Sequence, residues 1–122
     1  CDDEGLVVKL VLPRNVLNGT VPADLMLLSN VGVVDLSENY LWGDLPTEIG
    51  FLTELSDLSV GSNRLDKSIP STIGLLTSLR RLNVSGNEFG STLPTEVGLL
   101  TMLCILDLGM NAMIGSIPSE VV

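Results

Sequence analysis

Two consecutive stretches of 24 residues decide the fold: LSDLSVGSNRLDKSIPSTIGLLTS (residues 55–78) and LRRLNVSGNEFGSTLPTEVGLLTM (residues 79–102). Leucine, asparagine, proline and glycine stand at the same offsets in both stretches. The register extends along the chain, because one asparagine and one proline each recur every 24 residues. These residues are Asn15, Asn39, Asn63, Asn87 and Asn111, and Pro22, Pro46, Pro70, Pro94 and Pro118. Two residue types that stay in register over five copies indicate a stacked repeat.

Each copy contains a short predicted strand. The apolar order is L-x-x-L-x-L-x-x-N-x-L, and the alternation at Leu82 and Val84 in the fourth copy puts both side chains on one face. No single copy can bury its own apolar face, so neighbouring copies must supply the core. Strands stacked ~4.8 Å apart form a parallel sheet. The expected fold class is α/β: a right-handed solenoid, or horseshoe, with the sheet on the concave face and short 3-10 or helical turns on the convex face.

The asparagines and prolines have predicted structural roles. A buried asparagine in every copy is costly unless its amide is bonded, so we expect the five asparagines to form a ladder with the backbone of adjacent turns. Each proline is expected to open a short helical turn whose N-terminus favours a negative charge. The residues at that position are Asp24, Glu48, Glu96 and Glu120, with Thr72 in the remaining copy. Gly50, Gly74 and Gly98 are expected to adopt the left-handed conformation that ends such a turn.

The end of each copy carries a more specific motif. The stretch LWGDLPTEIG (residues 41–50) follows L-x-G-x-(I/L/V)-P-x-x-(I/L/V)-G. In this motif the chain resembles the plant-type leucine-rich repeat family over about residues 7–122. The resemblance implies an ectodomain of a receptor-like kinase or receptor-like protein, or a cell-wall enzyme inhibitor, of a plant or alga. Lys67 and Ser91 stand where other copies have a loop glycine that tolerates positive φ, so the loops of the third and fourth copies are expected to follow a different path.

The resemblance also implies domain limits. Caps of this family typically end in a cysteine before the first strand, and residues 1–6, with Cys1, look like the remnant of such a cap. Residues 7–122 are then five repeats, the last of them incomplete, so we expect the chain to be part of a longer protein. A disulfide between Cys1 and Cys104 would have to span four turns, or ~19 Å, whereas bonded cysteines have Cα atoms within ~7 Å. We therefore expect Cys104 to be packed as a small apolar side chain, with a reactive thiol as the alternative.

Composition excludes several functions. The chain of 122 residues is 45% hydrophobic but 3% aromatic, so its core must consist of Leu, Val and Ile. No apolar run approaches the ~18–20 residues of a membrane helix, so a membrane could be reached only through segments outside this chain. Fifteen acidic and six basic residues give a net charge of −9, which argues against nucleic acid and anionic lipid. Two cysteines are too few to predict a disulfide framework or a compartment.

The residues for catalysis are scarce. The chain has no histidine, which removes the usual neutral-pH base and histidine-based triads. Asp35 and Asp57 should project from neighbouring strands about 8 Å apart, a spacing compatible with an inverting glycosidase or a weak Ca²⁺ site. Solvated surface acids explain them better, because no other part of a catalytic site accompanies them. We expect a protein that is not an enzyme, with no cofactor and no metal.

Binding is the function that the pattern favours. The outward positions of the strands are those that the repeat does not dictate, and near their centre they are small and polar. The candidate ligand-binding residues are Asp35, Asp57, Ser59, Arg81, Asn83, Ser85 and Asp107. Asp57 with Arg81, and Arg14 with Glu38, are expected to form ion pairs of little energetic value. The expected ligand is a protein or a peptide; the alternative is that these strands are an unused stretch of a longer solenoid.

Two further features lie beside the strands. Tyr40 and Trp42 flank the inward-facing Leu41 and should face solvent, either as a binding hot spot or, for Trp42, as a cover for the next loop. Asn18-Gly19-Thr20 and Asn83-Val84-Ser85 match the glycosylation sequon, so Asn18 and Asn83 are candidate glycosylation sites. A glycan on Asn83 would occupy the concave trough.

A polar column offers a second class of function. Its members are Thr20, Asp44, Ser68, Thr92 and Ser116. Regular hydroxyl arrays bind ice or flat carbohydrate in some leucine-rich proteins, although Asp44 interrupts this array. We therefore expect a non-catalytic recognition module of an extracellular or cell-surface receptor-like protein. The alternative is a stand-alone secreted binder, such as a cell-wall enzyme inhibitor or a carbohydrate- or ice-binding protein.

Overall fold

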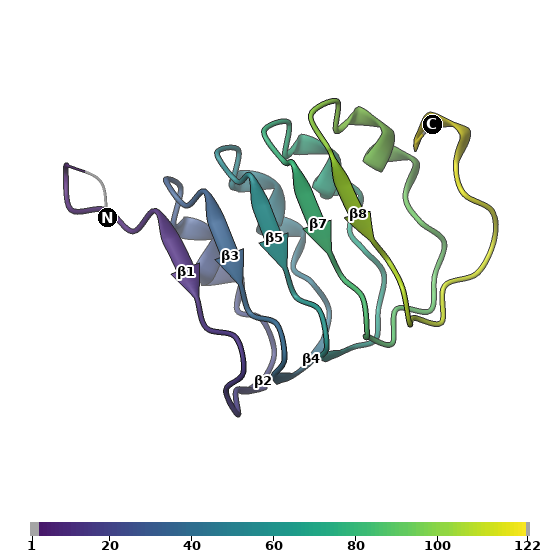
Figure 1. Ribbon diagram of the computed structural model, residues 1–122, viewed down its shortest axis with the longest axis horizontal. Coiled ribbons are helices and arrows are strands. Elements are labelled where there is room, and N and C mark those ends of the chain that lie inside the picture. The colour runs from purple at the N-terminus through teal and green to yellow at the C-terminus, as the bar shows by residue number, and fades with distance from the viewer. Residues whose placement is uncertain (1–2, 122) are drawn as a thin grey trace.

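One parallel sheet runs along the concave face of the solenoid (Figure 1). The computed structural model describes residues 3–121, with Met26 described by its backbone alone. Within these residues the sheet has five strands in chain order, and partner residues are 24 apart from Lys9 and Val33 onward. The strands are β1 (Lys9–Val11), β3 (Val33–Asp35), β5 (Asp57–Ser59), β7 (Arg81–Asn83) and β8 (Ile105–Asp107). The predicted fold class and strand columns are confirmed.

Short 3-10 helices form the opposite side of each turn, behind the strands in Figure 1. They are η1 (Ala23–Leu27), η2 (Thr47–Phe51), η3 (Ser71–Leu75), η4 (Thr95–Leu99) and η5 (Ser119–Val121). The residue before η1 to η4 is a repeat proline in an extended conformation. An acidic residue lies in the first turn of every 3-10 helix except η3, where Thr72 replaces it.

The prediction for the helix glycines is wrong. Gly50 and Gly74 lie inside η2 and η3 without positive φ, and Gly98 has the same place in η4. A Cβ on Gly74 would lie 2.8 Å from both the Cβ and the carbonyl oxygen of Glu96, and a Cβ on Gly50 would meet Thr72 at 3.0 Å. Glycine is needed at these positions because successive 3-10 helices approach each other closely, and not because the chain turns left-handed there.

A recurring left-handed position lies elsewhere, one residue before each ladder asparagine. Non-glycine residues take φ values of 51–55° at four of these positions, and Gly86 takes 62°. The four residues are Arg14, Glu38, Ser62 and Met110. This conformation costs roughly 1–2 kcal/mol for an L-residue other than glycine. It recurs at every turn because the residue that follows must direct its amide into the solenoid.

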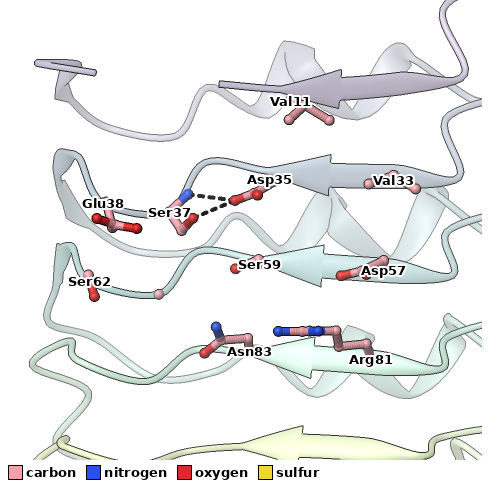
Figure 2. Close-up of a pocket in the computed structure, with 11 residues that line it drawn as sticks. Val11, Val33, Asp35, Ser37, Glu38, Asp57, Ser59, Ser62, Arg81 and Asn83 are labelled. Carbon is pink, nitrogen blue, oxygen red and sulfur yellow. Dashed lines mark hydrogen bonds between the residues drawn. The ribbon is translucent and has the colours of Figure 1, made fainter. Parts of the chain in front are cut away.

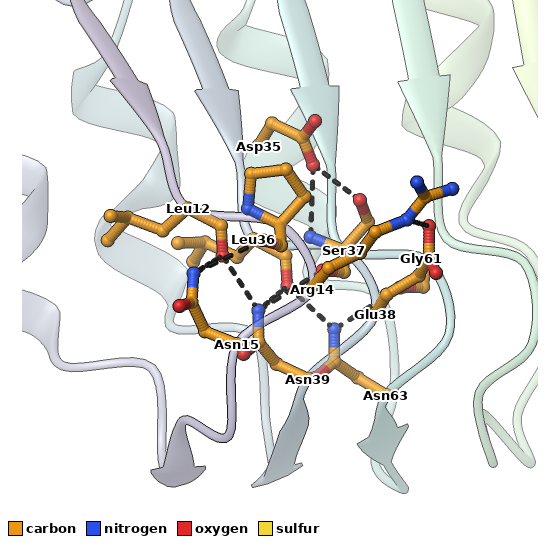
Figure 3. Close-up of polar contacts among 11 residues, drawn as sticks. Leu12, Arg14, Asn15, Asp35, Leu36, Ser37, Glu38, Asn39, Gly61 and Asn63 are labelled. Atoms are coloured by element: carbon orange, nitrogen blue, oxygen red, sulfur yellow. Dashed lines mark hydrogen bonds and ion pairs between the residues drawn. The ribbon is translucent and has the colours of Figure 1, made fainter.

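The predicted asparagine ladder is present (Figure 3). The side-chain nitrogen of Asn39 donates to the carbonyl of Leu12 on the preceding turn at 2.9 Å and to Leu36 on its own turn at 3.0 Å. Its side-chain oxygen accepts from the backbone N–H of Leu17 at 3.1 Å. Each of these amides therefore joins two turns.

The ladder changes along its length. Asn63, Asn87 and Asn111 repeat the bonds of Asn39 to the preceding turn. Asn15 is exposed, and among the described residues it donates only within its own turn, to Leu12 and Pro13. The bridging role predicted for all five asparagines is thus confirmed for four.

A second, smaller parallel sheet, which the sequence did not predict, follows the first turns. Its strands are β2 (Asn18–Gly19), β4 (Tyr40–Gly43) and β6 (Arg64–Leu65). Gly19, Gly43 and Gly115 have positive φ, whereas Lys67 and Ser91 do not. The expected change of loop path in the third and fourth copies is therefore confirmed, and within the described residues the second sheet ends at β6.

The core is a continuous stack of Leu, Ile and Val with the fully buried Phe89. Leu103, Leu106 and Leu108 of the fifth turn are half-buried, because no further turn within residues 3–121 stacks on them. The prediction for Cys104 is wrong: it is exposed at the sheet edge, and its thiol donates to the carbonyl of Met102 at 3.4 Å. Cys1, and with it the predicted cap remnant, lies outside the described residues. No helix among the described residues is long and apolar enough to cross a membrane.

Candidate functional site

The outward side chains of β1, β3, β5 and β7, with the loops that follow them, line a hollow of about 390 Å³ on the concave face (Figure 2). Five of the predicted ligand-binding residues lie in it: Asp35, Asp57, Ser59, Arg81 and Asn83. Ser85 and Asp107 do not line the hollow, although both continue the same repeat columns. The further lining residues are Val11, Val33, Ser37, Glu38, Gly61 and Ser62. Val11 could have been found from its column, which also holds Asp35 and Ser59.

The floor of the hollow consists of small residues. Ser59 and Gly61 are buried, and Ser62 lies at the rim. The carboxamide of Asn83 lies directly over Gly61, since a Cβ there would be 3.0 Å from the Asn83 side-chain nitrogen. Gly61 is therefore covered by the Asn83 carboxamide, and a ligand at the centre of the hollow would meet that side chain before the backbone of Gly61.

Hydrogen bonds hold three of the polar side chains in one position. The Oδ1 atom of Asp35 accepts from the backbone N–H of Ser37 at 3.0 Å and from its hydroxyl at 2.6 Å (Figure 2). Asn83 makes the same pair of bonds with Ser85, at 3.0 and 2.7 Å. Asp107 accepts from the N–H of Gly109 at 3.1 Å. Side chains fixed in this way lose little entropy when they bind a ligand.

One predicted ion pair is present and the other is not. Arg14 and Glu38 are joined at 2.9 Å, with both side chains exposed. Asp57 and Arg81 are register partners, but within residues 3–121 no ion pair joins them. The guanidinium of Arg81 extends along β7 and not across to Asp57 (Figure 2). Water screens such a pair and two side chains must be ordered to form it, so both charges remain open to a ligand.

The carboxylates do not form a catalytic or metal-binding cluster. Asp35 faces Ser59 across the strands and Asp57 faces Val33, which is the predicted offset of two residues. Among the described residues no group of three or more potential metal-ligating side chains comes together. The hollow offers two separate acids and one arginine for polar recognition.

The aromatic residues lie on the second sheet, beside the concave face. Tyr40 and Trp42 are 44% and 50% exposed and flank the buried Leu41, as predicted. The guanidinium of Arg64 lies 5.0 Å from the centre of the Tyr40 ring, which places a cation on that ring.

Hydroxyl groups occupy another flank. All five members of the predicted polar column are exposed. A second exposed column, which we did not predict, begins the 3-10 helices and contains Thr47, Ser71, Thr95 and Ser119. Between the two columns a hollow of about 650 Å³ is lined by Asp44, Ser68, Ser71 and Thr92, among others. The signal for the second column was the residue after each repeat proline.

Comparisons with known proteins agree with the fold. A family model described as Leucine Rich Repeat matches residues 78–100, and no curated protein sequence matches the chain significantly. A chain in the crystal structure of the BIR3–SERK2 complex from Arabidopsis thaliana is similar, with 33% identity and a TM-score of 0.93 over 98% of this chain and 64% of that chain.

Two other solved structures are informative. One is the leucine-rich repeat ectodomain of the Arabidopsis receptor kinase HAESA with an N-terminally extended IDA peptide hormone ligand, at 36% identity and a TM-score of 0.87 over 91% of this chain and 19% of that chain. The other is a plant ice-binding protein, at 26% identity and a TM-score of 0.88 over 93% of this chain and 37% of that chain. The chain spans less than two thirds of each of these three structures.

Proposed function

Because the chain is a leucine-rich repeat solenoid of the plant type, we propose that it is a non-catalytic recognition module that binds a protein or peptide in its concave hollow. The observation that carries this proposal is the hollow itself, where a floor of small residues lies beside Asp57 and Arg81, two charges that no ion pair joins within the described residues. The HAESA ectodomain, which has the same type of solenoid, is described with a peptide hormone ligand. We further propose that the chain acts outside the cell or at its surface, since several similar structures are receptor ectodomains.

The hollow fits an extended, polar ligand. Rigid strands present Asp57 and Arg81 at neighbouring register positions, so a ligand with a cation and an anion in suitable places would satisfy both. Asp35 and Asn83 are already held by hydrogen bonds and would add fixed acceptors and donors. No enzymatic step is assigned to these residues; glycosidase turnover that is lost in Asp35→Asn would contradict this part of the proposal.

The test is affinity for peptides selected from a displayed random library. Arg81→Ala and Asp57→Ala should each weaken the selected peptides about tenfold or more, because charged anchors in a binding surface contribute ~1.4 kcal/mol or more when truncated. Arg80→Ala is the matched control, since Arg80 is exposed and adjacent in sequence but does not line the hollow. Equal losses at Arg80 and Arg81, or no loss at either Arg81 or Asp57, would place the ligand elsewhere.

A stand-alone secreted binder of ice or flat carbohydrate is the second candidate. The specific observation in its favour is the pair of exposed hydroxyl columns with the hollow between them, together with the similarity to a plant ice-binding protein. Inhibition of ice recrystallisation and co-sedimentation with crystalline cellulose separate this candidate from the first. Ser71→Tyr should abolish either activity by interrupting the array, whereas Arg81→Ala should leave it unchanged.

A further inference from the structure

The two glycosylation sequons lie in very different surroundings. Asn18 is exposed on β2, and no hydrogen bond of its carboxamide occurs within the described residues. The Asn83 side-chain oxygen instead accepts two hydrogen bonds from Ser85, and its carboxamide lies over Gly61 in the concave hollow. A glycan on Asn83 would have to displace these contacts and fill the hollow, whereas a glycan on Asn18 would disturb none of them.

The strand register places Asn18 beside an aromatic side chain. Asn18 and Tyr40 are direct partners in the parallel pair β2–β4, so their side chains point to the same side of the small sheet. Trp42 lies two residues further along β4 and faces that side as well. The sequon asparagine and the exposed aromatic pair therefore lie on the same side of the small sheet.

The order of the strands places Tyr40 between Asn18 of β2 and Arg64 of β6. β4 lies between β2 and β6, and Arg64 of β6 holds the Tyr40 ring from the β6 side at 5.0 Å. The side that faces β2 and Asn18 has no such partner among the described residues. Tyr40 is 44% exposed, and the face of an exposed aromatic ring is a surface on which the C–H face of a pyranose can pack.

We propose that Asn18 is an N-glycosylated residue, that its first N-acetylglucosamine packs on Tyr40 and Trp42, and that Asn83 stays unmodified. The proposal rests on the proposed extracellular location, since the modification requires the secretory pathway. The glycan would cover the two aromatic side chains. Tyr40 and Trp42 would then be a packing surface for the glycan and not a binding surface for a protein partner. The concave hollow would remain open for its ligand.

The covalent step needs a lipid-pyrophosphate-linked oligosaccharide as the co-substrate. The side-chain nitrogen of Asn18 attacks C1 of the first sugar, and an N–C1 bond forms while the bond from C1 to the phosphate oxygen breaks. The amide nitrogen loses one proton to a base, and the lipid pyrophosphate leaves with the bonding electrons. No oxidation or reduction takes place.

The first experiment locates the glycan. The chain is secreted from plant or yeast cells behind an added signal peptide, which makes the result independent of its natural destination, and intact mass is measured before and after removal of N-glycans. The wild type and Ser85→Ala should carry one glycan, and Thr20→Ala and Asn18→Gln should carry none. Thr20→Ala and Ser85→Ala are matched, because each removes one sequon and leaves its asparagine in place. A glycan on Asn83, or none on Asn18, would overturn the proposal.

The second experiment tests the packing on the aromatic pair. Trp42 is the sole tryptophan of the chain, so its collisional quenching by acrylamide reports directly on this pair. The quenching constant should be lower, by roughly twofold, with the whole glycan or with one remaining sugar than after complete removal, since a sugar would cover one face of a ring. Equal quenching in all three forms would overturn the packing.

Failure of this proposal is distinguishable from failure of the proposed function. Peptide affinity and its dependence on Arg81 can be measured on chain produced in bacteria, which carries no N-glycan. Loss of the Asn18 assignment would leave that measurement unchanged, and loss of peptide binding would leave the mass measurement unchanged.

Discussion

Replacing Asn63 by alanine should destabilise the solenoid far more than the same change at Asn15. The Asn63 side chain is buried and donates to the carbonyls of Leu36 and Val60, each at 3.0 Å. Its oxygen accepts from the backbone N–H of Leu41 at 2.9 Å, the one bond that the structure gives to this donor within the described residues. The mutation therefore removes bonds to the preceding turn and within the residue's own turn at once.

The magnitude follows from which groups keep a partner. The carbonyls of Leu36 and Val60 each retain a second amide, from Asn39 and Asn87 respectively, so they lose a bond without becoming unsatisfied. The N–H of Leu41 becomes a buried donor without an acceptor, at a cost of ~1–3 kcal/mol. The two lost hydrogen bonds of 3.0 Å add ~0.5–1.5 kcal/mol each, beside a longer contact of 3.3 Å to the carbonyl of Gly61, for a total loss of roughly 2–6 kcal/mol.

Asn15 supplies the control. It is exposed and, among the described residues, bonds only to carbonyls of its own turn, so Asn15→Ala should cost at most about 1 kcal/mol. Urea unfolding followed by far-UV circular dichroism gives both values, provided the m-values agree. Hydrogen exchange of the Leu41 amide should accelerate in Asn63→Ala alone. Equal losses of stability for the two variants, or a loss below about 1 kcal/mol for Asn63→Ala, would show that the bonds of Asn63 to the preceding turn do not stabilise the solenoid as proposed.

The remaining predictions use matched pairs of residues. Phe89 is fully buried and Phe51 is 65% exposed, so Phe89→Ala should lower the free energy of unfolding by ~3–5 kcal/mol, and Phe51→Ala by about 0.5 kcal/mol or less. Gly74→Ala should cost ~1–3 kcal/mol, because the added methyl group would overlap Glu96 of the next turn. Gly90→Ala should be nearly neutral, since the nearest atom to its Cβ position is 3.9 Å away. Urea unfolding measures all four, and a neutral Gly74→Ala would mean that the 3-10 helices can separate at little cost.

The parts of the fold that could be predicted are those fixed by the period. A repeat of 24 residues sets the strand register. The shared column of Asp57 and Arg81 and the bridging role of Asn63 could therefore be predicted from the repeat length alone. The left-handed residues could not be found in this way. The best signal for positive φ is glycine, yet four of the five positions have other residues, such as Glu38 and Ser62.

The remaining differences concern groups whose position depends on water or on a neighbouring turn. The absent Asp57–Arg81 ion pair shows that a shared column brings two charges near each other but does not order two solvated side chains. The role of Gly74 depends on the distance between two 3-10 helices, which the sequence does not encode locally. The second sheet was missed because two of its three strands, β2 and β6, are only two residues long, too short for an alternating pattern.

The regularity of each surface column bears on the kind of ligand that it could bind. The column that begins the 3-10 helices repeats one chemistry, with a hydroxyl at each position from Thr47 to Ser119. The concave column instead changes at every step. Its members in chain order are Lys9, Val33, Asp57, Arg81 and Ile105.

A ligand with a repeating lattice, such as ice or crystalline polysaccharide, binds best to a column that presents the same side chain at every turn of the solenoid. On the concave face such a ligand would meet a different side chain at each strand. An aperiodic ligand gains instead from a column whose residues differ from strand to strand, because five different side chains at a fixed pitch specify five different contacts. The concave face is thus suited to a ligand with a sequence of its own, and for this reason we place a peptide or protein there and would look for a periodic ligand only on the hydroxyl-bearing flank.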